Sequence, residues 1–585
     1  MNREWSLKEL YDGFDDPLFK ADAQRFDAVC SQIAQSAETM EGKTDAQIAR
    51  LYLQQNEALK ELSDKLIVYA SLRQAANAKD VQAASQLGRL MGRYSAVAGP
   101  CAVMVKRIAA TQDMEALIAS DPLFTQYAYL LRMMKSDSRY LLGALQEEIM
   151  AKYDISGGDA WANLQSYLTS SVEVDYKGDT VTLSSVRNLA YEPNRSVRKA
   201  AYEAELAAYK KIQDPVAFSL NHIKLQVLNE CKLRGYASPL DKTLHEARMT
   251  RKTLDALLGA MDAYLPVFWK YLRAKANALG HQNGLPWYDL FAPMGNNSKK
   301  YTTEEAKAYL VDLFRTFDGQ LAQMVERAFD EAWIDFYPRD GKQGGAFCCG
   351  IHPLGQSRIL TNFDGSFSDV VTLAHELGHA YHNLALQDHR PLNTDYSMPV
   401  AETASTFNEN IIMNAAIKAA SKKEEKLALI ESQLSDTTQI ICDIYSRYLF
   451  ETAVFESREE DFLFAGRLCE MMLDTQKKAY GDGLDPNALH PYMWVCKGHY
   501  YNSHLSFYNF PYAFGGLFAR GLYAKYEQEG DAFVPLYKQM LKATPIHCVE
   551  DTARIAGIDL TDRGFWEMSL ESFKPLVDEF CSLVR

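Results

Sequence analysis

TLAHELGHAYH, residues 372–382, carries the pattern His-Glu-x-x-His, and the rest of the chain can be interpreted outward from it. Residues four apart on an α-helix lie on one face, so His375 and His379 can present two imidazole nitrogens to one metal ion. Glu376 would lie beside that metal, where a carboxylate can take a proton from water whose pKa zinc lowers to about 7. The alternative is a surface helix with fortuitous histidines.

The residues around this pattern favour the metal site. Gly378 lies between the histidines of an otherwise good helix, where glycine costs about 1 kcal/mol relative to alanine, which indicates that another segment approaches the backbone there. The preceding residues 337–369 are rich in glycine and contain the short apolar runs AFCC and RILTNF. These runs predict two strands of a small sheet that lead into a helix capped by Ser366 or Ser368.

A catalytic zinc ion needs a third protein ligand and an open position. The longer pattern HExxHxxGxxH is absent, because position 382 is His and position 385 is Ala. The segment 399–420, PVAETASTFNENIIMNAAIKAA, predicts a helix after Pro399 that carries Glu402 and Glu409 seven residues apart on one face. Glu402 would complete a His, His, Glu set.

Two further side chains near the pattern have less direct roles. Glu409 would accept a hydrogen bond from a ligand histidine and orient it, although a solvated carboxylate fits its spacing equally well. His382 is expected to be a hydrogen-bonded neighbour, since a fourth ligand would close the site and end catalysis.

KGHYYNSHLSFYNFPYAFGG, residues 497–516, is a second candidate segment. Hydrolysis of a peptide bond creates an oxyanion, and histidine and tyrosine side chains are typical donors to it. His499, Tyr508 and Tyr512 could have this role. The chain has 33 tyrosines, so by composition alone aromatic packing is the simpler explanation.

The remaining sequence predicts a mainly α protein. Apolar positions three and four apart recur over residues 1–150, again from about residue 192 to about residue 335, and again over residues 370–585. SVEVDYKGDTVTLSS, residues 171–185, alternates on both sides of Lys177-Gly178-Asp179 and predicts a β-hairpin. We expect an N-terminal helical domain with this hairpin over residues 1–190 and a catalytic domain over residues 191–585.

The composition excludes several classes of protein. Lys plus Arg number 62 and Asp plus Glu number 76, and a net charge of −14 without cationic blocks argues against binding to nucleic acid or to a membrane surface. The charged start MNREWSLKELYDGFDD lacks the apolar run of a secretion signal, and we find no run of about 18 to 20 apolar residues. Ten scattered cysteines without a CxxC pair favour a cytoplasmic protein with reduced thiols.

Several segments together resemble one known family. GGAFCCG, ILTNFDGSFSDVVTLAHELGHAYH, AETASTFNE and KGHYYNSHLSFYNFPYAFG follow one another in that order, and WSLKELYDGFDDPLF stands near the start. They are similar to the signatures of the oligoendopeptidase F branch of the thimet oligopeptidase family of zinc peptidases. The resemblance spans nearly the whole chain, and the ordered set of motifs is more specific than the histidine pattern alone.

The resemblance implies a large two-lobed helical zincin-like body, with a small sheet next to the active-site helix and a deep channel for short unstructured peptides. It implies one zinc ion per chain and an edge strand that pairs with the peptide backbone. The residues it assigns are His375, His379 and Glu402 as zinc ligands, Glu376 as general base and acid, His499, Tyr508 and Tyr512 as contacts to the substrate and the tetrahedral intermediate, and Gly345, Ala346 and Phe347 as the edge strand.

The expected function is therefore a zinc oligoendopeptidase that cleaves internal bonds of short peptides. One alternative is a metallo-carboxypeptidase or dipeptidase on the same site, which would need a basic group to hold the terminal carboxylate of the substrate. Another is a non-catalytic helical protein that binds peptides and holds a structural metal. The sequence predicts peptides as partners and leaves the oligomeric state open.

Overall fold

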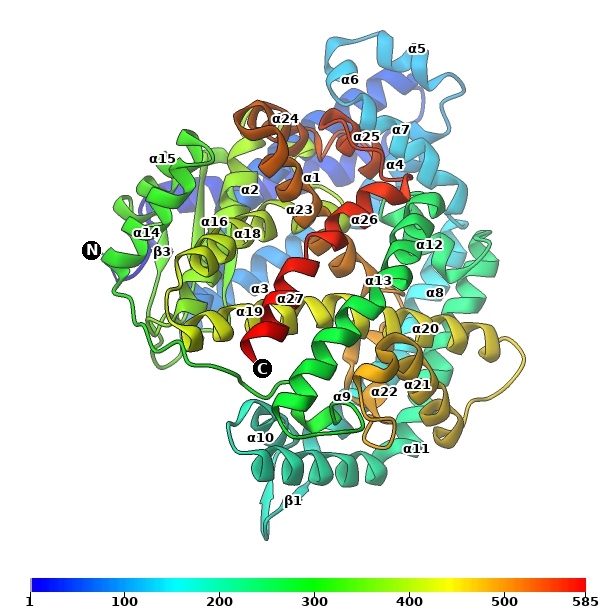
Figure 1. The fold of residues 1–585 in the computed structure, drawn as a ribbon. Coiled ribbons are helices and arrows are strands. Elements are labelled where there is room, and N and C mark those ends of the chain that lie inside the picture. Colours follow the sequence, from blue (N-terminus) through cyan, green and yellow to red (C-terminus); the bar gives the residue numbers. More distant parts are fainter. Residues whose placement is uncertain (1–2) are drawn as a thin grey trace.

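The protein is described by a computed structural model over residues 3–585, so the first two residues of the predicted N-terminal domain lie outside it. Helices make up most of the chain, and the strands form one two-stranded and one three-stranded sheet within the described residues (Figure 1). The mainly α fold predicted from the sequence is therefore confirmed. In the described range, each helix is too short or too polar to span a bilayer.

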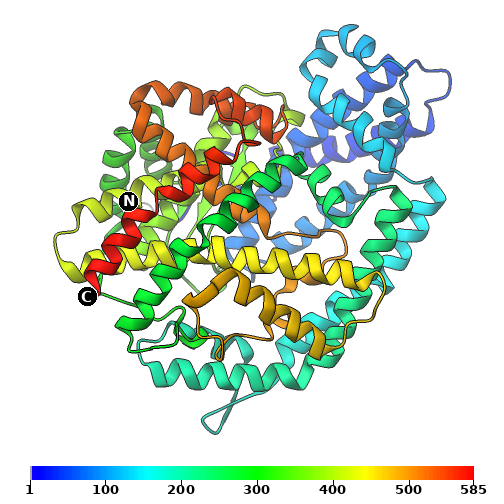
Figure 2. The same ribbon diagram turned by 45° about the vertical axis from the view of Figure 1, so that its right-hand side comes forward.

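The N-terminal part is a series of helices that often start at a side-chain cap. Thr44 and Asp80 each accept a hydrogen bond from a backbone N–H of the first turn that follows, which satisfies a donor that the helix itself leaves unpaired. Two views of the molecule show the cyan α5–α7 region projecting from one end of the body (Figure 2). The helices are α1 (Pro17–Glu38), α2 (Asp45–Ala76), α3 (Val81–Ala96), α4 (Ala98–Ala109), α5 (Met114–Ala119), α6 (Pro122–Gln126), α7 (Ala128–Asp137), α8 (Ala144–Ser156) and α9 (Gly158–Ser171).

The predicted β-hairpin is present between α9 and α10. Strands β1 (Val174–Tyr176) and β2 (Asp179–Val181) pair antiparallel, and Lys177 and Gly178 both have positive φ, as a tight hairpin turn requires. Asn194 caps the long helix that follows. This central part contains α10 (Leu183–Asn188), α11 (Arg195–Arg234), α12 (Pro239–Glu246), α13 (Arg251–Ala278), α14 (Thr303–Arg315) and α15 (Gly319–Asp330).

The second sheet precedes the helix that carries the histidine pattern. Strands β4 (Phe347–Ile351) and β5 (Gln356–Leu360) are the two predicted strands, and they pair antiparallel. The sequence did not reveal a third strand, β3 (Ile334–Asp335), which pairs parallel to β5 and gives the order β3-β5-β4. Strand β4 therefore lies at the edge of the sheet. Ser366, rather than Ser368, caps the following helix in a reciprocal pair of hydrogen bonds with Asp369.

The C-terminal part is again mostly helical, and its longer connections without α-helix include residues 386–397, 481–492 and 502–509. The last of these lies between a short 3₁₀ turn, η8 (Gly498–Tyr501), and α23. Its helices are α16 (Phe367–Ala385), α17 (Met398–Ala401), α18 (Thr403–Ala419), α19 (Lys423–Thr438), α20 (Ile444–Arg458), α21 (Ala465–Tyr480), α22 (Met493–Cys496), α23 (Phe510–Glu529), α24 (Phe533–Ala543), α25 (Val549–Ile555), α26 (Arg563–Glu571) and α27 (Lys574–Leu583).

The small sheet is covered on both faces by different parts of the chain. Side chains alternate along a strand, so Cys348 and Ile359 face the main core, which runs from Val174 to Phe580 in the sequence. Ile351 and Leu360 face a second core built from the N-terminal helices α1–α3. Helix α16, which carries the histidine pattern, packs on the main-core side of this sheet.

Helices α16 and α18 cross in close contact at Gly378. A Cβ atom on that glycine would lie 2.5 Å from the carbonyl oxygen of Ala404 and 2.5 Å from the Cα of Ser405, closer than such atoms approach in proteins. The close approach inferred from the sequence is thus the approach of α18, which brings the segment carrying Glu402 to the histidines.

Gly378→Ala is expected to lower the free energy of unfolding by about 1 to 3 kcal/mol, because the methyl group forces apart two buried backbones. A matched control is Gly88→Ala in α3, where a Cβ meets nothing within 4 Å and helix propensity should raise stability by roughly 0.5 to 1 kcal/mol. Thermal and urea unfolding measure both changes. Equal stability of the two variants would contradict the crossing at Gly378.

Candidate active site

His375, His379 and Glu402 bring their donor atoms to one point. The Nε2 atoms of His375 and His379 lie 3.3 Å and 3.4 Å from Oε2 of Glu402, and the three donor atoms are within 4.8 Å of one another. The two imidazole rings are nearly perpendicular, at 83°. Two imidazoles and one carboxylate are a donor set that zinc takes in hydrolytic sites, so these residues fit a zinc ion.

The sequence predicted one continuous helix around Glu402, but the structure has two helices there. Glu402 lies at the junction where α17 ends and α18 begins, with backbone angles of −91° and 8°. Ser405 Oγ donates a hydrogen bond of 2.7 Å to Oε2 of Glu402 and one of 3.1 Å to its backbone carbonyl. The break turns the carboxylate toward α16, and Ser405 fixes its direction.

Glu409 lies on the far side of His375 from the donor cluster. Its Oε1 is 2.5 Å from Nδ1 of His375, the ring nitrogen that does not face Glu402. Burial alone would lower the pKa of His375, but the hydrogen bonds to Glu402 and Glu409 outweigh it and raise that pKa to about 10. A proton held at Nδ1 by Glu409 leaves Nε2 as the lone-pair donor for a metal.

Glu409→Gln is expected to weaken zinc affinity by about 10- to 100-fold, because the amide no longer holds the Nδ1 proton of His375 with a charged acceptor. Competition with a fluorescent zinc chelator measures the affinity directly. Glu456→Gln in α20, at an exposed carboxylate, is the control and should leave the affinity unchanged. An unchanged affinity for Glu409→Gln would show that the 2.5 Å contact does not orient the ligand.

Glu376 is buried beside the metal ligands, with 6% of the residue exposed. Within residues 3–585 its carboxylate has no hydrogen bond or ion pair, so it is free to exchange a proton with a substrate or with water. Burial raises its pKa, while the positive charge available on His375 and His379 opposes that shift. The site thus contains one unengaged carboxylate, that of Glu376, next to two engaged ones: Glu402 lies among the candidate metal donors, and Glu409 contacts Nδ1 of His375.

His499, Tyr508 and Tyr512 form a linked set. The rings of His499 and Tyr508 stack at 5.8 Å between centroids, and Tyr512 donates a hydrogen bond of 2.6 Å to the hydroxyl of Tyr508. Nε2 of His499 is buried without a hydrogen-bond partner. Burial first, and then the nearby charges of Arg447 and Lys497, lower the pKa of His499 to about 3, so the imidazole is neutral at pH 7.

Helix α23 connects this set to the metal ligands. Tyr512 lies in its first turn, and a Cβ on Gly515 would lie 3.2 Å from Cβ of Glu402. Burial, the hydrogen bond with Tyr508 and the nearby charge of Glu402 raise the pKa of Tyr512. The structure therefore brings the start of α23 against Glu402, a contact that the sequence could not reveal.

Of the three residues expected in the edge strand, only Phe347 lies in a strand. Phe347 begins β4, but Gly345 and Ala346 precede the strand, and Gly345 has a φ of +79° that marks a turn. Asn362 donates a hydrogen bond of 2.9 Å to the carbonyl of Gly345 and holds this turn. Since β4 is at the edge of the sheet, the strand surface available for pairing starts at Phe347.

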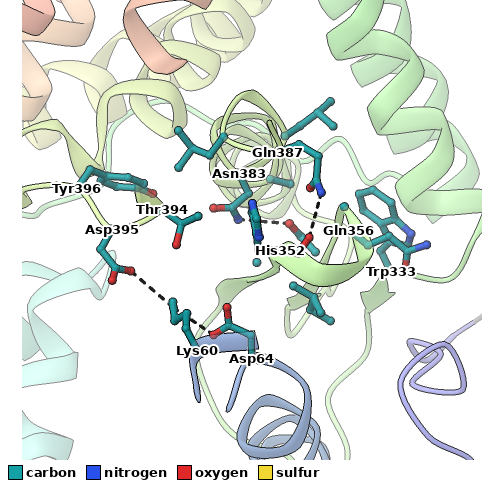
Figure 3. A pocket seen from close by; sticks show the side chains of 17 residues that line it. Lys60, Asp64, Trp333, His352, Gln356, Asn383, Gln387, Thr394, Asp395 and Tyr396 are labelled. Atoms are coloured by element: carbon teal, nitrogen blue, oxygen red, sulfur yellow. Dashed lines mark hydrogen bonds and ion pairs between the residues drawn. The ribbon is translucent and has the colours of Figure 1, made fainter. Parts of the chain in front are cut away.

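His382 is a buried, hydrogen-bonded neighbour, as predicted, and lies outside the group of donor atoms of His375, His379 and Glu402. Its Nε2 is 2.8 Å from Oγ1 of Thr544, and its ring stacks on Tyr396 at 4.2 Å between centroids. On the face of α16 that also carries Glu376, Ala380 and Asn383 line a cavity of about 290 Å³ (Figure 3). Figure 3 shows Lys60 and Asp64 of α2 on its opposite wall, across from Asp395.

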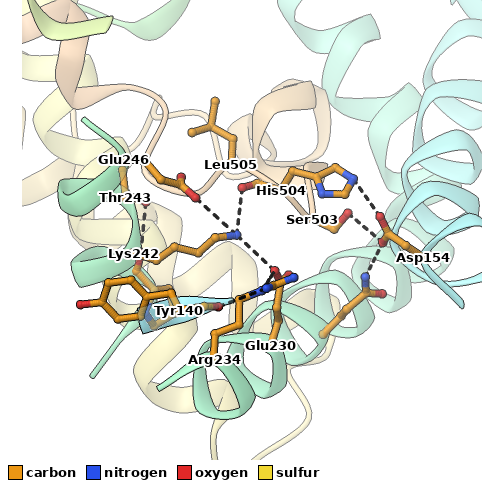
Figure 4. A network of polar contacts seen from close by, with 12 residues as sticks. Tyr140, Asp154, Glu230, Arg234, Lys242, Thr243, Glu246, Ser503, His504 and Leu505 are labelled. Carbon is orange, nitrogen blue, oxygen red and sulfur yellow. Dashed lines mark hydrogen bonds and ion pairs between the residues drawn. The ribbon is translucent and has the colours of Figure 1, made fainter. Parts of the chain in front are cut away.

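The segment that carries the His/Tyr set is anchored from outside by a polar network (Figure 4). His504 Nε2 lies 2.8 Å from Oδ2 of Asp154 in α8, and Ser503 donates a hydrogen bond of 3.2 Å to Oδ1 of the same residue. Lys242 of α12 donates a hydrogen bond of 3.2 Å to the carbonyl of His504. Through these contacts His504 helps to hold this segment against α8 and α12.

Comparisons with known proteins agree with this geometry. Residues 188–572 match the protein family described as Peptidase family M3. The chain is 27% identical to oligoendopeptidase F of Lactococcus lactis subsp. cremoris, over 69% of this chain and 67% of that protein, and 23% identical to oligopeptidase PepF of Bacillus subtilis, over 99% and 87%.

Solved structures show the same fold. A crystal structure of a protein from Chlamydophila abortus superposes with a TM-score of 0.87 at 20% identity, covering 99% of this chain and 98% of that one. The crystal structure of oligoendopeptidase-F from Enterococcus faecium superposes with a TM-score of 0.70 at 19% identity, covering 97% and 99%.

Proposed function

Because the chain belongs to peptidase family M3, in its oligoendopeptidase F branch, it is a metalloendopeptidase, and we propose that it cleaves internal bonds of short unstructured peptides with one zinc ion held by His375, His379 and Glu402. The observation that carries this proposal is the donor set of two imidazoles and one carboxylate, next to the unengaged carboxylate of Glu376. That combination is what hydrolysis of a peptide bond by zinc requires.

Glu376 is the proton carrier of the proposed reaction. Zinc bound by the three ligands would supply Lewis acidity, which polarises a peptide carbonyl and makes water acidic enough to lose a proton near neutral pH. The Glu376 carboxylate takes that proton as the water attacks the carbonyl carbon, and returns it to the departing amine nitrogen. Burial favours the neutral form of Glu376, which suits a group that must hold the proton between these two transfers.

The His/Tyr set supplies hydrogen bonds to the oxygen of the attacked carbonyl. Tyr512 donates its proton to Tyr508, so the proton of Tyr508 is free to point toward a substrate. His499 is neutral and its Nε2 has no partner within the described chain. Donors that are already positioned can lower the barrier by stabilising the charge that develops on that oxygen.

The substrate would lie along β4, starting at Phe347, with main-chain hydrogen bonds that do not depend on its sequence. Domains at 1–190 and 191–585 remain part of the proposal, with the family match from residue 188 as support for the second. The ten cysteines are all free in the described chain, which supports the proposed cytoplasmic location.

A digest of a random peptide mixture, analysed by mass spectrometry with and without a zinc chelator, tests the function. We expect internal fragments that disappear with the chelator and return with added zinc. Ladders from one end of each peptide would instead indicate a carboxypeptidase or dipeptidase. Unaltered peptides after prolonged incubation with zinc-loaded protein would contradict a peptidase altogether.

A further inference from the structure

A large cavity adjoins the candidate active site and has no role in the mechanism above. It has a volume of about 670 Å³ and lies among α10, α11, α19 and the segment that leads into η8. It shares the lining residues Ser432 and Asp436 with a smaller cavity of about 340 Å³, which Glu409 also lines. The two cavities thus have a wall of α19 in common, and the smaller one reaches Glu409, the partner of His375.

Most charged side chains that line this cavity have a partner of opposite charge. The nitrogen–oxygen distances are 3.3 Å for Arg187 with Glu205, 2.8 Å for Arg198 with Asp289, and 2.5 Å for Glu431 with Lys275. Lys497 and Asp436 differ from them. Within residues 3–585, neither side chain has a hydrogen bond or an ion pair.

Lys497 lies in electropositive surroundings just before the His/Tyr set. It precedes η8, which contains His499, and its charge lowers the pKa of that histidine. Burial, followed by repulsion from Arg447, lowers the pKa of Lys497 itself, while the charge of Asp443 opposes this shift in part. A half-buried ammonium group without a partner is costly for a protein, and an anionic ligand in the cavity would lower that cost.

We propose that Lys497 binds a carboxylate of the peptide substrate, most directly the carboxylate at its C-terminus. This inference rests on the proposed peptidase function. Every unmodified peptide has a C-terminal carboxylate, and an Asp or Glu side chain is the other source of the same group. Asp436, on a different element of the cavity wall, can accept hydrogen bonds from backbone N–H groups of the same peptide and disfavours ligands with several negative charges.

A bound C-terminus would fix the position of the cleaved bond relative to the end of the peptide. If Lys497 holds the C-terminus, the bond at the metal centre lies at a fixed distance from that end, and short peptides are cleaved at a preferred position. The basic group that a carboxypeptidase would need is thus present, two residues before His499 and on the wall of a cavity of about 670 Å³.

Three quenched fluorescent peptides of one length test the inference. The first has a free C-terminal carboxylate, the second is its C-terminal amide, and the third is the amide with a glutamate as its last residue. For the wild-type protein we expect KM for the free acid to be lower than KM for the amide by about tenfold, the effect of one hydrogen bond to a charged group. A similarly low KM for the third peptide would identify side-chain carboxylates as a second source.

Lys497→Met is expected to raise KM for the free acid to the value of the amide, with little change in kcat or in the melting temperature. Lys497→Arg should keep the preference for the free acid, and Lys152→Met, at an exposed lysine of α8, should behave as wild type. Equal losses on acid and amide together with a lower melting temperature would indicate a structural role and overturn the inference. Equal KM values of wild type for acid and amide would also overturn it.

The amide serves as the internal reference for the proposed function. If wild type cleaves the amide but shows no preference for the acid, only the carboxylate site is wrong. If zinc-loaded wild type leaves all three peptides intact, the proposed peptidase function fails, and the inference fails with it.

Discussion

Glu376→Gln is expected to lower kcat on a quenched fluorescent peptide by a factor of about 10² to 10⁴, while the protein retains its zinc. Glutamine has the size of glutamate, and its amide cannot take a proton from water or return one to the leaving amine. The three metal ligands are not altered, and Glu376 makes no hydrogen bond that the substitution would break. Kinetics and elemental analysis of the purified variant measure the two quantities separately.

The matched control is Glu460→Gln, which neutralises an exposed carboxylate after α20 and should leave kcat and zinc content unchanged. Full turnover of Glu376→Gln would rule out the proton transfers assigned to this residue. A variant that loses both zinc and activity would mean that Glu376 supports the metal site and would leave the proton carrier to be sought elsewhere.

Glu402→Ala is expected to abolish stable zinc binding, and activity with it, because it removes one of three ligands and the only negative charge among them. The loss of zinc affinity should exceed the loss of about 10- to 100-fold expected for Glu409→Gln, which leaves all three ligands in place. Titration of both variants with a zinc chelator of known affinity gives the order directly.

Ser405→Ala provides an intermediate case, since it removes only the hydrogen bond that directs the Glu402 carboxylate. Zinc affinity should decrease in the order wild type, Ser405→Ala, Glu402→Ala. If Glu402→Ala kept wild-type affinity, the third ligand would have to be another residue, and the junction between α17 and α18 would lose its proposed role.

Local patterns were sufficient to predict the parts of the site that depend on neighbours in sequence. The one-turn spacing of His375 and His379, the cap at Ser366 and the hairpin at Lys177-Gly178 are each determined by a few adjacent residues. The identity of Glu402 could be inferred because the next helix begins close by. Its position at a helix break could not, since that break depends on contact with Gly378 and Gly515.

The features that the sequence did not reveal depend on residues far apart in the chain. Strand β3 has two residues, too few for any alternating pattern, and it exists because β5 pairs with it. The ion pair of Lys60 with Asp395 joins α2 to the loop before Glu402. The lack of a partner for Lys497 depends on charged side chains that several distant elements place around the cavity.

The core shared between the N-terminal helices and the sheet limits how far the chain can be shortened from its N-terminus. Ile351 and Leu360 are fully buried against α1–α3, and a chain that began near residue 188 would expose both, at a cost of about 1.5 to 3 kcal/mol each. The strand proposed to receive the substrate would lose the support of one face. The N-terminal helices therefore support the strand proposed to receive the substrate, and a minimal active fragment must include them.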